Sequence, residues 1–312
     1  MGPVHHPVMA ARVVEFLVTR TDGFYVDCTV GGGGHARQVL LNAPSGRLLG
    51  IDLDEETLVT AQAALDTFGS RVTLRQGNFG SLKEIVAEEG IGQVDGVLFD
   101  LGYSSLQLDA PERGLSFSSD GPLDMRFDRA VGASALDVIS RSSERDLAAI
   151  IKRFGEERRA HPIARSILQA KHDGLLETTS DLKRAVLKTK PGRKTKTLAR
   201  VFQALRIAVN DELDNLRRGL EGAVDVLRPG GRIVVLSYHS LEDRIVKRFF
   251  VGSERPCTCP KDLPHCVCGR KPTLRILTKR VERPEDAEVH GNPRARSAKL
   301  RAAERLAEGE QP

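Results

Sequence analysis

A run of four glycines directly after an apolar segment constrains this 312-residue chain more than any other feature. The segment Phe24-Tyr-Val leads into Asp27, the glycines occupy positions 31–34, and a helix-like stretch, Ala36–Leu41, follows. Glycines at the end of a strand let the main chain turn sharply and let a ligand approach the backbone closely. This order predicts a nucleotide-type cofactor site at the first turn of a doubly wound sheet.

Apolar segments typical of strands alternate with helical patterns through the first hundred residues. The expected elements are, in chain order, the strand Arg47–Asp54, the helix Glu55–Phe68, the strand Arg71–Phe79, the helix Leu82–Glu89 and the strand Val94–Tyr103. Such alternation predicts a parallel sheet.

The next strand, Gly231–His239, comes more than a hundred residues later and follows an expected helix end and turn at Leu227–Gly231. A crossover between neighbouring parallel strands needs only about 30 residues, so a further domain is inserted here. Its patterns are helical, with apolar stripes over Asp146–Phe154 and over Phe202–Leu220, the latter read as one long helix. We expect an α/β fold in which an all-helical domain, 106–215, interrupts a sheet domain formed by 1–105 and 216–312.

Composition and the N-terminal sequence indicate which partners and which cellular compartment to expect. The net charge of +5 is compatible with a polyanionic partner, whereas the absence of Trp and only 4% aromatic residues argue against aromatic base-stacking platforms. The N-terminus lacks a signal-peptide pattern, and no apolar stretch is long enough to span a bilayer. We expect a cytoplasmic protein with no membrane partner and with reduced cysteines.

The glycine loop suits two cofactors. Gly31-x-Gly33-x-x-Ala36, with Asp52 about 20 residues further on, fits the dinucleotide fingerprint of a nicotinamide dehydrogenase. The same elements serve S-adenosylmethionine, whose cationic end would be attracted by an acid near the loop such as Asp27. The end of the fourth strand favours this second interpretation.

Asp100-Leu-Gly-Tyr103 has the spacing of the Asp-Pro-Pro-Tyr motif of amino-methyltransferases. An aromatic exocyclic amine is a poor nucleophile because its lone pair is delocalised into the ring. A carboxylate and a backbone carbonyl that accept its N–H bonds would aim the lone pair at a methyl group. Tyr103 could stack on the base, and Ser104 and Ser105 could add contacts; alternatively Asp100 only caps a turn.

Several longer blocks resemble the bacterial small-subunit rRNA cytosine-N4 methyltransferases. They extend in order over nearly the whole chain: His5–Val8, Asp100–Asp109, Glu112–Phe117, Asp120–Asp128, Phe154–Arg158, Thr197–Leu213, Ser237–Arg244 and Asn292–Ser297.

The resemblance implies a class I (Rossmann-like) methyltransferase sheet with a helical domain inserted after the fourth strand. It implies an enzyme that uses S-adenosylmethionine to methylate the exocyclic amine of one cytidine in the decoding region of 16S rRNA, within the small ribosomal subunit. The cofactor contacts that it implies are Gly33, Gly34, His35, Asp52, Phe79, Asp100 and Gln107. Gly32 stands where the family also has larger residues, and Tyr103 where it also has aliphatic ones.

His239 follows the fifth strand and either positions the substrate or relays a proton, unless its hydrogen bonds are structural. Ser240 with Glu242 and Asp243 is typical of a helix start. His5 and His6 could cover the pocket or belong to a solvated terminus.

Two Cys-x-Cys pairs, Cys257 with Cys259 and Cys266 with Cys268, bring four thiols into a dozen residues. They suit tetrahedral zinc, with His265 as an alternative ligand, although disulfides or uncoordinated thiols remain open. Cys28 is expected in the core at a strand end.

Basic residues cluster in a presumed loop and near the C-terminus. They are candidates for RNA phosphate contacts, unless they only form a solvated face: Lys188, Lys190, Arg193, Lys194, Lys196, Arg294, Arg296, Lys299 and Arg301. A nicotinamide dehydrogenase and a non-enzymatic RNA-binding ribosome-assembly factor are the alternative functions. The sequence leaves the oligomeric state open, a homodimer included.

Overall fold

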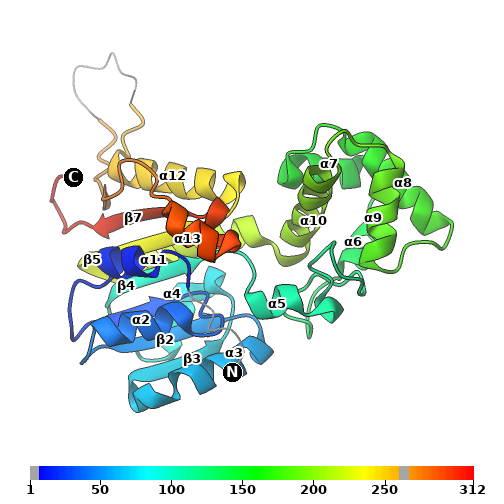
Figure 1. The fold of residues 1–312 in the computed structure, drawn as a ribbon. Helices are drawn as coiled ribbons and strands as arrows, with labels where there is room; N and C mark the ends of the chain where they lie inside the picture. The colour runs from blue at the N-terminus through cyan, green and yellow to red at the C-terminus, as the bar shows by residue number, and fades with distance from the viewer. Residues whose placement is uncertain (1–6, 260–266) are drawn as a thin grey trace. The chain divides into compact units, whose positions relative to one another are not determined.

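The computed structural model describes residues 7–259 and 267–312, and the chain divides into two compact units (Figure 1). The first unit comprises Met1–Gly102 and Leu213–Pro312, and the second comprises Tyr103–Glu212. The boundaries predicted from the sequence fall after residues 105 and 215. Among the described residues, no helix combines the length and apolarity needed to cross a bilayer.

The first unit is built on a seven-stranded sheet with the order β3-β2-β1-β4-β5-β7-β6. Its strands are β1 (Phe24–Asp27), β2 (Arg47–Asp52), β3 (Val72–Gln76), β4 (Val94–Asp100), β5 (Leu227–Ser237), β6 (Leu274–Ile276) and β7 (Lys299–Arg305). Strands β1 to β5 pair in parallel, whereas β7 is antiparallel to both β5 and β6. The predicted α/β fold is confirmed.

Helices cover both faces of this sheet because its strands bury side chains in both directions. Tyr25 packs into the core under α1 (Ala10–Leu17), α2 (Gly34–Asn42) and α3 (Glu55–Leu65). The next residue, Val26, packs into the opposite core with α4 (Leu82–Glu88), α11 (Glu212–Val226) and α12 (Ser240–Glu254). Shorter elements complete the unit: η1 (Asp66–Arg71), η2 (Phe79–Ser81), α13 (Asp286–Gly291) and η4 (Pro293–Ser297).

Strand β5 begins earlier than the sequence predicts. Leu227 pairs with Val94, and the next pair joins Arg232 to Gly96, so residues 228–231 form an irregularity inside the strand. Gly230 supplies the positive φ of 78° that this local turn requires. The expected turn is present, but its placement before the strand was wrong.

Strand β7 was missed by the sequence reading, which expected only a basic terminal segment. Leu300, Ala302 and Ala303 are fully buried between β5 and β6. Two of these three residues are alanines, whose small side chains give a weak strand signal next to four charged neighbours.

The second unit is helical. Its elements are α5 (Ser105–Asp109), η3 (Pro111–Arg113), α6 (Ala135–Arg141), α7 (Glu144–Gly155), α8 (Ala160–His172), α9 (Thr179–Lys188) and α10 (Lys194–Asn210). Helices α6, α7 and α9 each start with a capping box in which a Ser or Thr pairs with an Asp three residues later. The unit has its own apolar core, which includes Leu147, Ile163 and Phe202.

The apolar stripe over Phe202–Leu220 forms two helices, so the prediction of one long helix was wrong. Asp211 ends α10 with a φ of 49°, a left-handed conformation that aspartate tolerates better than most residues. The preceding Asn210 donates a 2.8 Å hydrogen bond to the carbonyl of Met125 and accepts one of 2.8 Å from the amide of Phe127. These bonds fix the helix end to the segment before α6.

The basic stretch 188–197, expected as a loop, is helical at both ends and irregular only in its middle five residues. Lys188 is the last residue of α9, and Lys194 and Lys196 lie in the first turn of α10. Only residues 189–193 connect the two helices, and Lys190 adopts a φ of 50° within them.

Candidate active site at the carboxyl edge of the sheet

Three acids end three strands of the sheet. Asp27 ends β1, Asp52 ends β2 and Asp100 ends β4, and these strands are neighbours in the order β2-β1-β4. The strand order reverses between β1 and β4, and in doubly wound sheets ligands bind outside the carboxyl ends of the strands at such a point. All three carboxylates therefore lie at the edge where a cofactor is expected.

The glycine loop between β1 and α2 uses its glycines unequally. Gly31 and Gly33 have φ values of 52° and 82°, which favour glycine strongly. A Cβ on Gly33 would also approach the Leu65 side chain to 3.1 Å. Gly32 has neither constraint, because a Cβ at that position would have Thr60 Cγ2 as its nearest neighbour, at 3.9 Å. A larger residue fits at Gly32 without changing the loop.

Asp52 holds the loop against the second strand. Its Oδ2 accepts a 3.0 Å hydrogen bond from the Gly31 amide, and its Oδ1 accepts one of 3.0 Å from the Asp54 amide. Burial raises the pKa of Asp52 to about 6 even though these amides lower it. Each carboxylate oxygen has further lone pairs, so Asp52 can accept ribose hydroxyls while it holds the loop.

Asp27 is a buried acid with one unsatisfied oxygen. Its Oδ1 accepts a 3.2 Å hydrogen bond from the Thr29 amide, whereas its Oδ2 has no hydrogen-bond partner among the described residues. Burial raises the pKa of Asp27 to about 7, and the neighbouring carboxylates of Asp100 and Asp52 raise it further against the opposing effect of His35. A cationic ligand would stabilise the ionised form of this group, which fits the sulfonium and ammonium groups of S-adenosylmethionine.

Asp100 is held by three neighbours. Its amide donates a 2.7 Å hydrogen bond to Thr29 Oγ1, and the Tyr238 hydroxyl donates one of 2.7 Å to its Oδ1. His35 Nε2 lies 3.4 Å from Oδ2, the second carboxylate oxygen. The carboxylate remains partly exposed, at 26% of its side-chain surface, so a substrate can reach it.

His35 lies in the first turn of α2 and is buried. Burial disfavours its charged form, but the adjacent Asp100 carboxylate outweighs that cost and leaves the pKa of His35 raised. When protonated, His35 would place a positive charge beside Asp100 and Asp27.

His239 is engaged in structural hydrogen bonding as the N-cap of α12. Its Nδ1 accepts a bond of 3.4 Å from the Glu242 amide, and its Nε2 lies 3.1 Å from Glu242 Oε1. Glu242 Oε2 in turn accepts the amides of Tyr238 and His239 at 2.9 and 3.2 Å. These contacts give His239 a structural role at Nδ1, whereas its buried Nε2 makes no hydrogen bond among the described residues, and its catalytic role stays a prediction.

Phe79 follows β3 and packs edge-on against Phe99, with ring centroids 5.6 Å apart. Helix α11 approaches it closely, because a Cβ on Gly219 would lie 2.9 Å from the Phe79 ring. Phe79 is thus fixed and partly exposed after the third strand.

Tyr103, Ser104 and Gln107 belong to the second unit. The Arg206 guanidinium lies 4.8 Å from the centre of the Tyr103 ring, and this ring is 41% exposed. Ser104 and Gln107 form the capping box of α5 through bonds of 3.2 and 2.9 Å. Their contacts with substrate or cofactor stay predictions.

Among the cysteines, Cys28 is buried at the end of β1 as expected, and Cys257, Cys259 and Cys268 lie together after α12. Four of the candidate residues fall outside the part of the chain that the structure describes: His5, His6, His265 and Cys266.

Two of the C-terminal basic residues predicted to contact RNA phosphates form ion pairs with an acid of the same chain. Lys299 and Arg301, at 3.2 and 2.7 Å from Asp243, lower the pKa of that acid despite its burial. Arg294 and Arg296 lie in η4.

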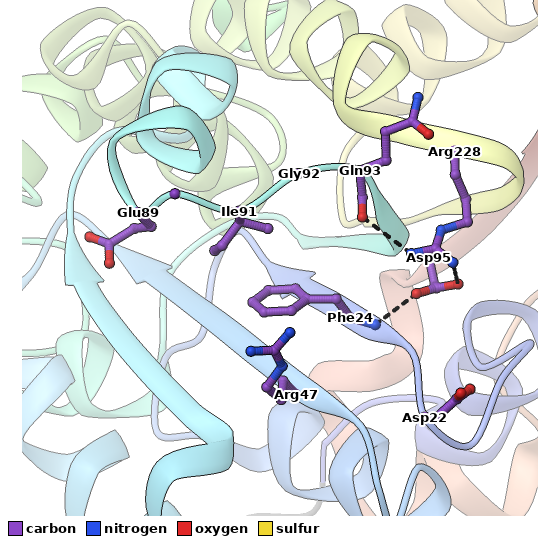
Figure 2. Close-up of a pocket in the computed structure, with 10 residues that line it drawn as sticks. Asp22, Phe24, Arg47, Glu89, Ile91, Gly92, Gln93, Asp95 and Arg228 are labelled. Atoms are coloured by element: carbon purple, nitrogen blue, oxygen red, sulfur yellow. Dashed lines mark hydrogen bonds and ion pairs between the residues drawn. The ribbon is translucent and has the colours of Figure 1, made fainter.

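A cavity of about 250 Å³ lies at the opposite edge of the sheet (Figure 2). Phe24 and Arg47 line it from the starts of β1 and β2. Asp95 accepts the Phe24 amide at 2.7 Å and lies 3.3 Å from Arg228. Its buried acid, Asp95, is already paired with Phe24 and Arg228. The cavity lies at the other end of the strands and is therefore separate from the site at the carboxyl edge.

The sheet order, the glycine loop and the three strand-end acids define a class I methyltransferase that uses S-adenosylmethionine. The chain belongs to the MraW methylase family, whose model matches residues 3–306. A protein from Geobacter sulfurreducens named ribosomal RNA small subunit methyltransferase H is 52% identical over 307 residues, covering 97% of this chain and 99% of that one. A protein of the same name from Symbiobacterium thermophilum is 47% identical over 312 residues, covering 98% of both chains.

Solved structures agree more loosely. A putative rRNA methylase from Clostridium thermocellum aligns with 95% of this chain and 95% of its own, at a TM-score of 0.43 and 13% identity. A putative methyltransferase from Streptococcus mutans, in complex with SAH, aligns with 97% of this chain and 99% of its own, at a TM-score of 0.42 and 12% identity. The family assignment rests on the sequence relatives, and it confirms the predicted resemblance.

Tyr238 is the residue of this site that the sequence reading missed. It lies directly after β5, beside the strand-end position that drew attention to His239. Because β5 pairs with β4, the residue after β5 lies beside the end of β4 where Asp100 is located. The pairing of those two strands was the only available signal.

Proposed function

We propose that this protein methylates the exocyclic N4 amine of one cytidine in the decoding region of 16S rRNA, within the small ribosomal subunit in the cytoplasm. The observation that carries the proposal is Asp100 at the strand-order reversal of a methylase sheet, where Thr29 Oγ1 accepts its amide and the Tyr238 hydroxyl donates to its carboxylate. The names of the full-length relatives support a small-subunit rRNA substrate. The choice of cytosine N4 rests on the strand-end Asp-x-x-Tyr spacing and on the family resemblance.

The residues at the carboxyl edge fit the cofactor. Asp27 offers an unsatisfied buried oxygen to a cationic group, and Asp52 offers acceptors to ribose hydroxyls. Gly33, Gly34 and His35 bring the start of α2 close to the ligand, and Phe79 supplies an apolar surface beyond β3. When bound, S-adenosylmethionine supplies a methyl group activated by a sulfonium.

Asp100 would accept an N–H of the substrate amine. This hydrogen bond would hold the nitrogen in one orientation and increase electron density on it. Methylation would replace one N–H of the amine with an N–C bond, so that proton must leave the nitrogen. Asp100 can take that proton at Oδ2, because Tyr238 already donates to Oδ1.

Tyr238 can only donate in this arrangement. Burial and the nearby Asp100 carboxylate raise the pKa of Tyr238 well above that of an ordinary tyrosine, so its hydroxyl stays protonated. The bond fixes the rotation of the Asp100 carboxylate.

The helical unit would bind the RNA. A cavity of about 420 Å³ in this unit is lined by five basic side chains, Arg158, Arg159, Arg193, Lys196 and Arg200, together with Glu157. Arg193, Lys194 and Lys196 lie at the start of α10, where the helix dipole disfavours cations and where no acid is present in the first turn. An anionic ligand such as a phosphate would offset both effects. We assign substrate recognition to this unit. Contacts of Tyr103 and Ser104 with the base, and of Gln107 with the cofactor, stay predictions from the sequence.

Two experiments separate the proposal from its alternatives. Calorimetry should detect S-adenosylmethionine binding and no NAD binding, whereas a dehydrogenase would show the reverse. Radiolabelled methyl groups should be incorporated into small subunits purified from a strain that lacks the enzyme. A ribosome-assembly factor would bind these particles without labelling them.

A further inference from the structure

We propose that Cys257, Cys259 and Cys268 bind one structural Zn²⁺ ion through their thiolates. The three sulfur atoms all lie within 4.8 Å of one another. A tetrahedral zinc site, with Zn–S distances of about 2.3 Å, separates its sulfurs by about 3.8 Å. The side chains are thus already grouped on the scale of a metal site, and this inference does not depend on the proposed reaction.

The number of sulfurs in the cluster favours a metal over a disulfide. A disulfide joins two sulfurs, and it would leave the third without a reason to lie beside them. Thiolates are soft ligands that select zinc, whereas Ca²⁺ and Mg²⁺ take oxygen ligands. The sequence groups Cys266 with these three cysteines, but it lies outside the described part of the chain, and the proposed site consists of the three described thiolates.

The segment that carries the cysteines connects α12 to β6, and its described residues bury little apolar surface. Its described residues, 255–259 and 267–273, include no buried side chain, and Val267 is 78% exposed. Figure 1 shows the described part of this segment projecting beyond the end of α12. Chain segments that bury little apolar surface are commonly held by a metal or by disulfides.

The base of the segment is ordered by the rest of the unit. The Thr273 amide donates a 2.9 Å hydrogen bond to the Ser253 carbonyl, and the Ile276 amide donates one of 2.9 Å to Glu254 Oε1. Beyond this base, the described residues form two arms, 255–259 and 267–273, and each arm carries cysteines of the cluster. A zinc ion would cross-link Cys257 and Cys259 on the first arm to Cys268 on the second, in place of a hydrophobic core.

Metal analysis of the purified full-length protein, prepared with reductant and without chelator, tests the proposal. We expect about one zinc per chain, released by a thiol-specific mercurial and not by dialysis. Cobalt-reconstituted protein should show the visible ligand-field absorption of a tetrahedral thiolate site. The double variant Cys259→Ser/Cys268→Ser should lose the metal, whereas Cys28→Ala, which removes the remote fifth cysteine, should keep it. Circular dichroism of each variant establishes that it is folded.

A second measurement does not depend on those variants. Removing the metal should increase the rate of tryptic cleavage after the exposed Arg270 at least several-fold, because the cross-link between the two arms is lost. Less than about half an equivalent of zinc after reconstitution, with all thiols freely titratable, would overturn the proposal. So would full zinc content in the folded double variant.

Discussion

The Tyr238 hydroxyl donates a 2.7 Å hydrogen bond to Oδ1 of Asp100, across the paired strands β5 and β4. This bond leaves Oδ2 as the oxygen that faces His35 and is available to a substrate amine. It also ties the candidate catalytic carboxylate to the sheet rather than to a mobile loop. The geometry of methyl transfer should therefore depend on Tyr238 through the orientation of Asp100.

Replacing Tyr238 with Phe should lower kcat about tenfold, because a hydrogen bond to a charged group contributes roughly 1.5 kcal/mol or more. The affinity for S-adenosylmethionine should stay within about twofold, because the rest of the cofactor site is unchanged. Single-turnover rates with small subunits, together with calorimetry, measure the two effects separately. An equal loss of cofactor affinity and rate would mean that Tyr238 supports the fold of the site rather than Asp100.

The loop glycines provide a matched pair. Gly33→Ala places a side chain at a φ of 82° and 3.1 Å from Leu65, so it should cost about 1–2 kcal/mol of stability and weaken cofactor binding. Gly32→Ala should be nearly neutral, because its nearest contact is at 3.9 Å. Thermal unfolding and calorimetry on both variants check this difference, and equal effects would contradict the loop geometry.

Asp27 should make the stability of the ligand-free protein depend on pH. Its pKa is about 7 in the folded protein, so folding keeps it protonated between about pH 4 and 7, where the unfolded chain is ionised. Its contribution to stability is fully present below about pH 4 and is lost as the pH rises to about 7. Denaturant unfolding across this range should show the decline in the wild type and a smaller one in Asp27→Asn.

Cofactor binding should respond in the opposite direction, because a cation prefers the ionised carboxylate. Affinity for S-adenosylmethionine should rise by up to about tenfold between pH 6 and 8. Loss of a proton from His35, which lies beside Asp100, would also increase affinity for the cationic cofactor as the pH rises. The difference in affinity between wild type and Asp27→Asn therefore isolates the contribution of the Asp27 carboxylate. A wild-type affinity that is level across this range would contradict the assignment.

The basic cavity of the helical unit should contribute to the salt dependence of RNA binding. Arg193→Ala/Lys196→Ala should reduce the slope of log affinity against log salt by about 1.4 to 1.8, the value for two lost phosphate contacts. Lys171→Ala/Arg184→Ala removes the same charge from residues that do not line the cavity. A similar slope change in both double variants would argue for a general charge effect.

The sequence was sufficient for the features that depend on neighbouring residues. The glycine loop, the strand-end acids Asp27, Asp52 and Asp100, and the α/β class all follow from local pattern and spacing. Strand β7 was missed because Ala302 and Ala303 give little strand signal, although the sheet around them buries both residues completely. The break at Asp211 interrupts no apolar period, so only the backbone conformation reveals it.

Contacts between residues distant in sequence could not be predicted. Tyr238 and Asp100 are 138 residues apart, and their bond depends on β5 pairing beside β4. The sequence predicts Lys299 and Arg301 as candidates for phosphate contacts, whereas in the structure both form ion pairs with Asp243. The positions of basic residues in a sequence do not indicate which acidic side chains will lie beside them in the folded protein.

The most direct test is the identity of the methylated nucleoside. Small subunits from a strain without the enzyme should be incubated with S-adenosylmethionine and wild-type protein, and their 16S rRNA digested for mass spectrometry. We predict N4-methylcytidine at one site in the decoding region, and at least a hundredfold slower formation with Asp100→Asn than with the surface control Asp66→Asn. Methylation at a ring carbon or a ribose hydroxyl, or full activity of Asp100→Asn with normal cofactor binding, would contradict this prediction.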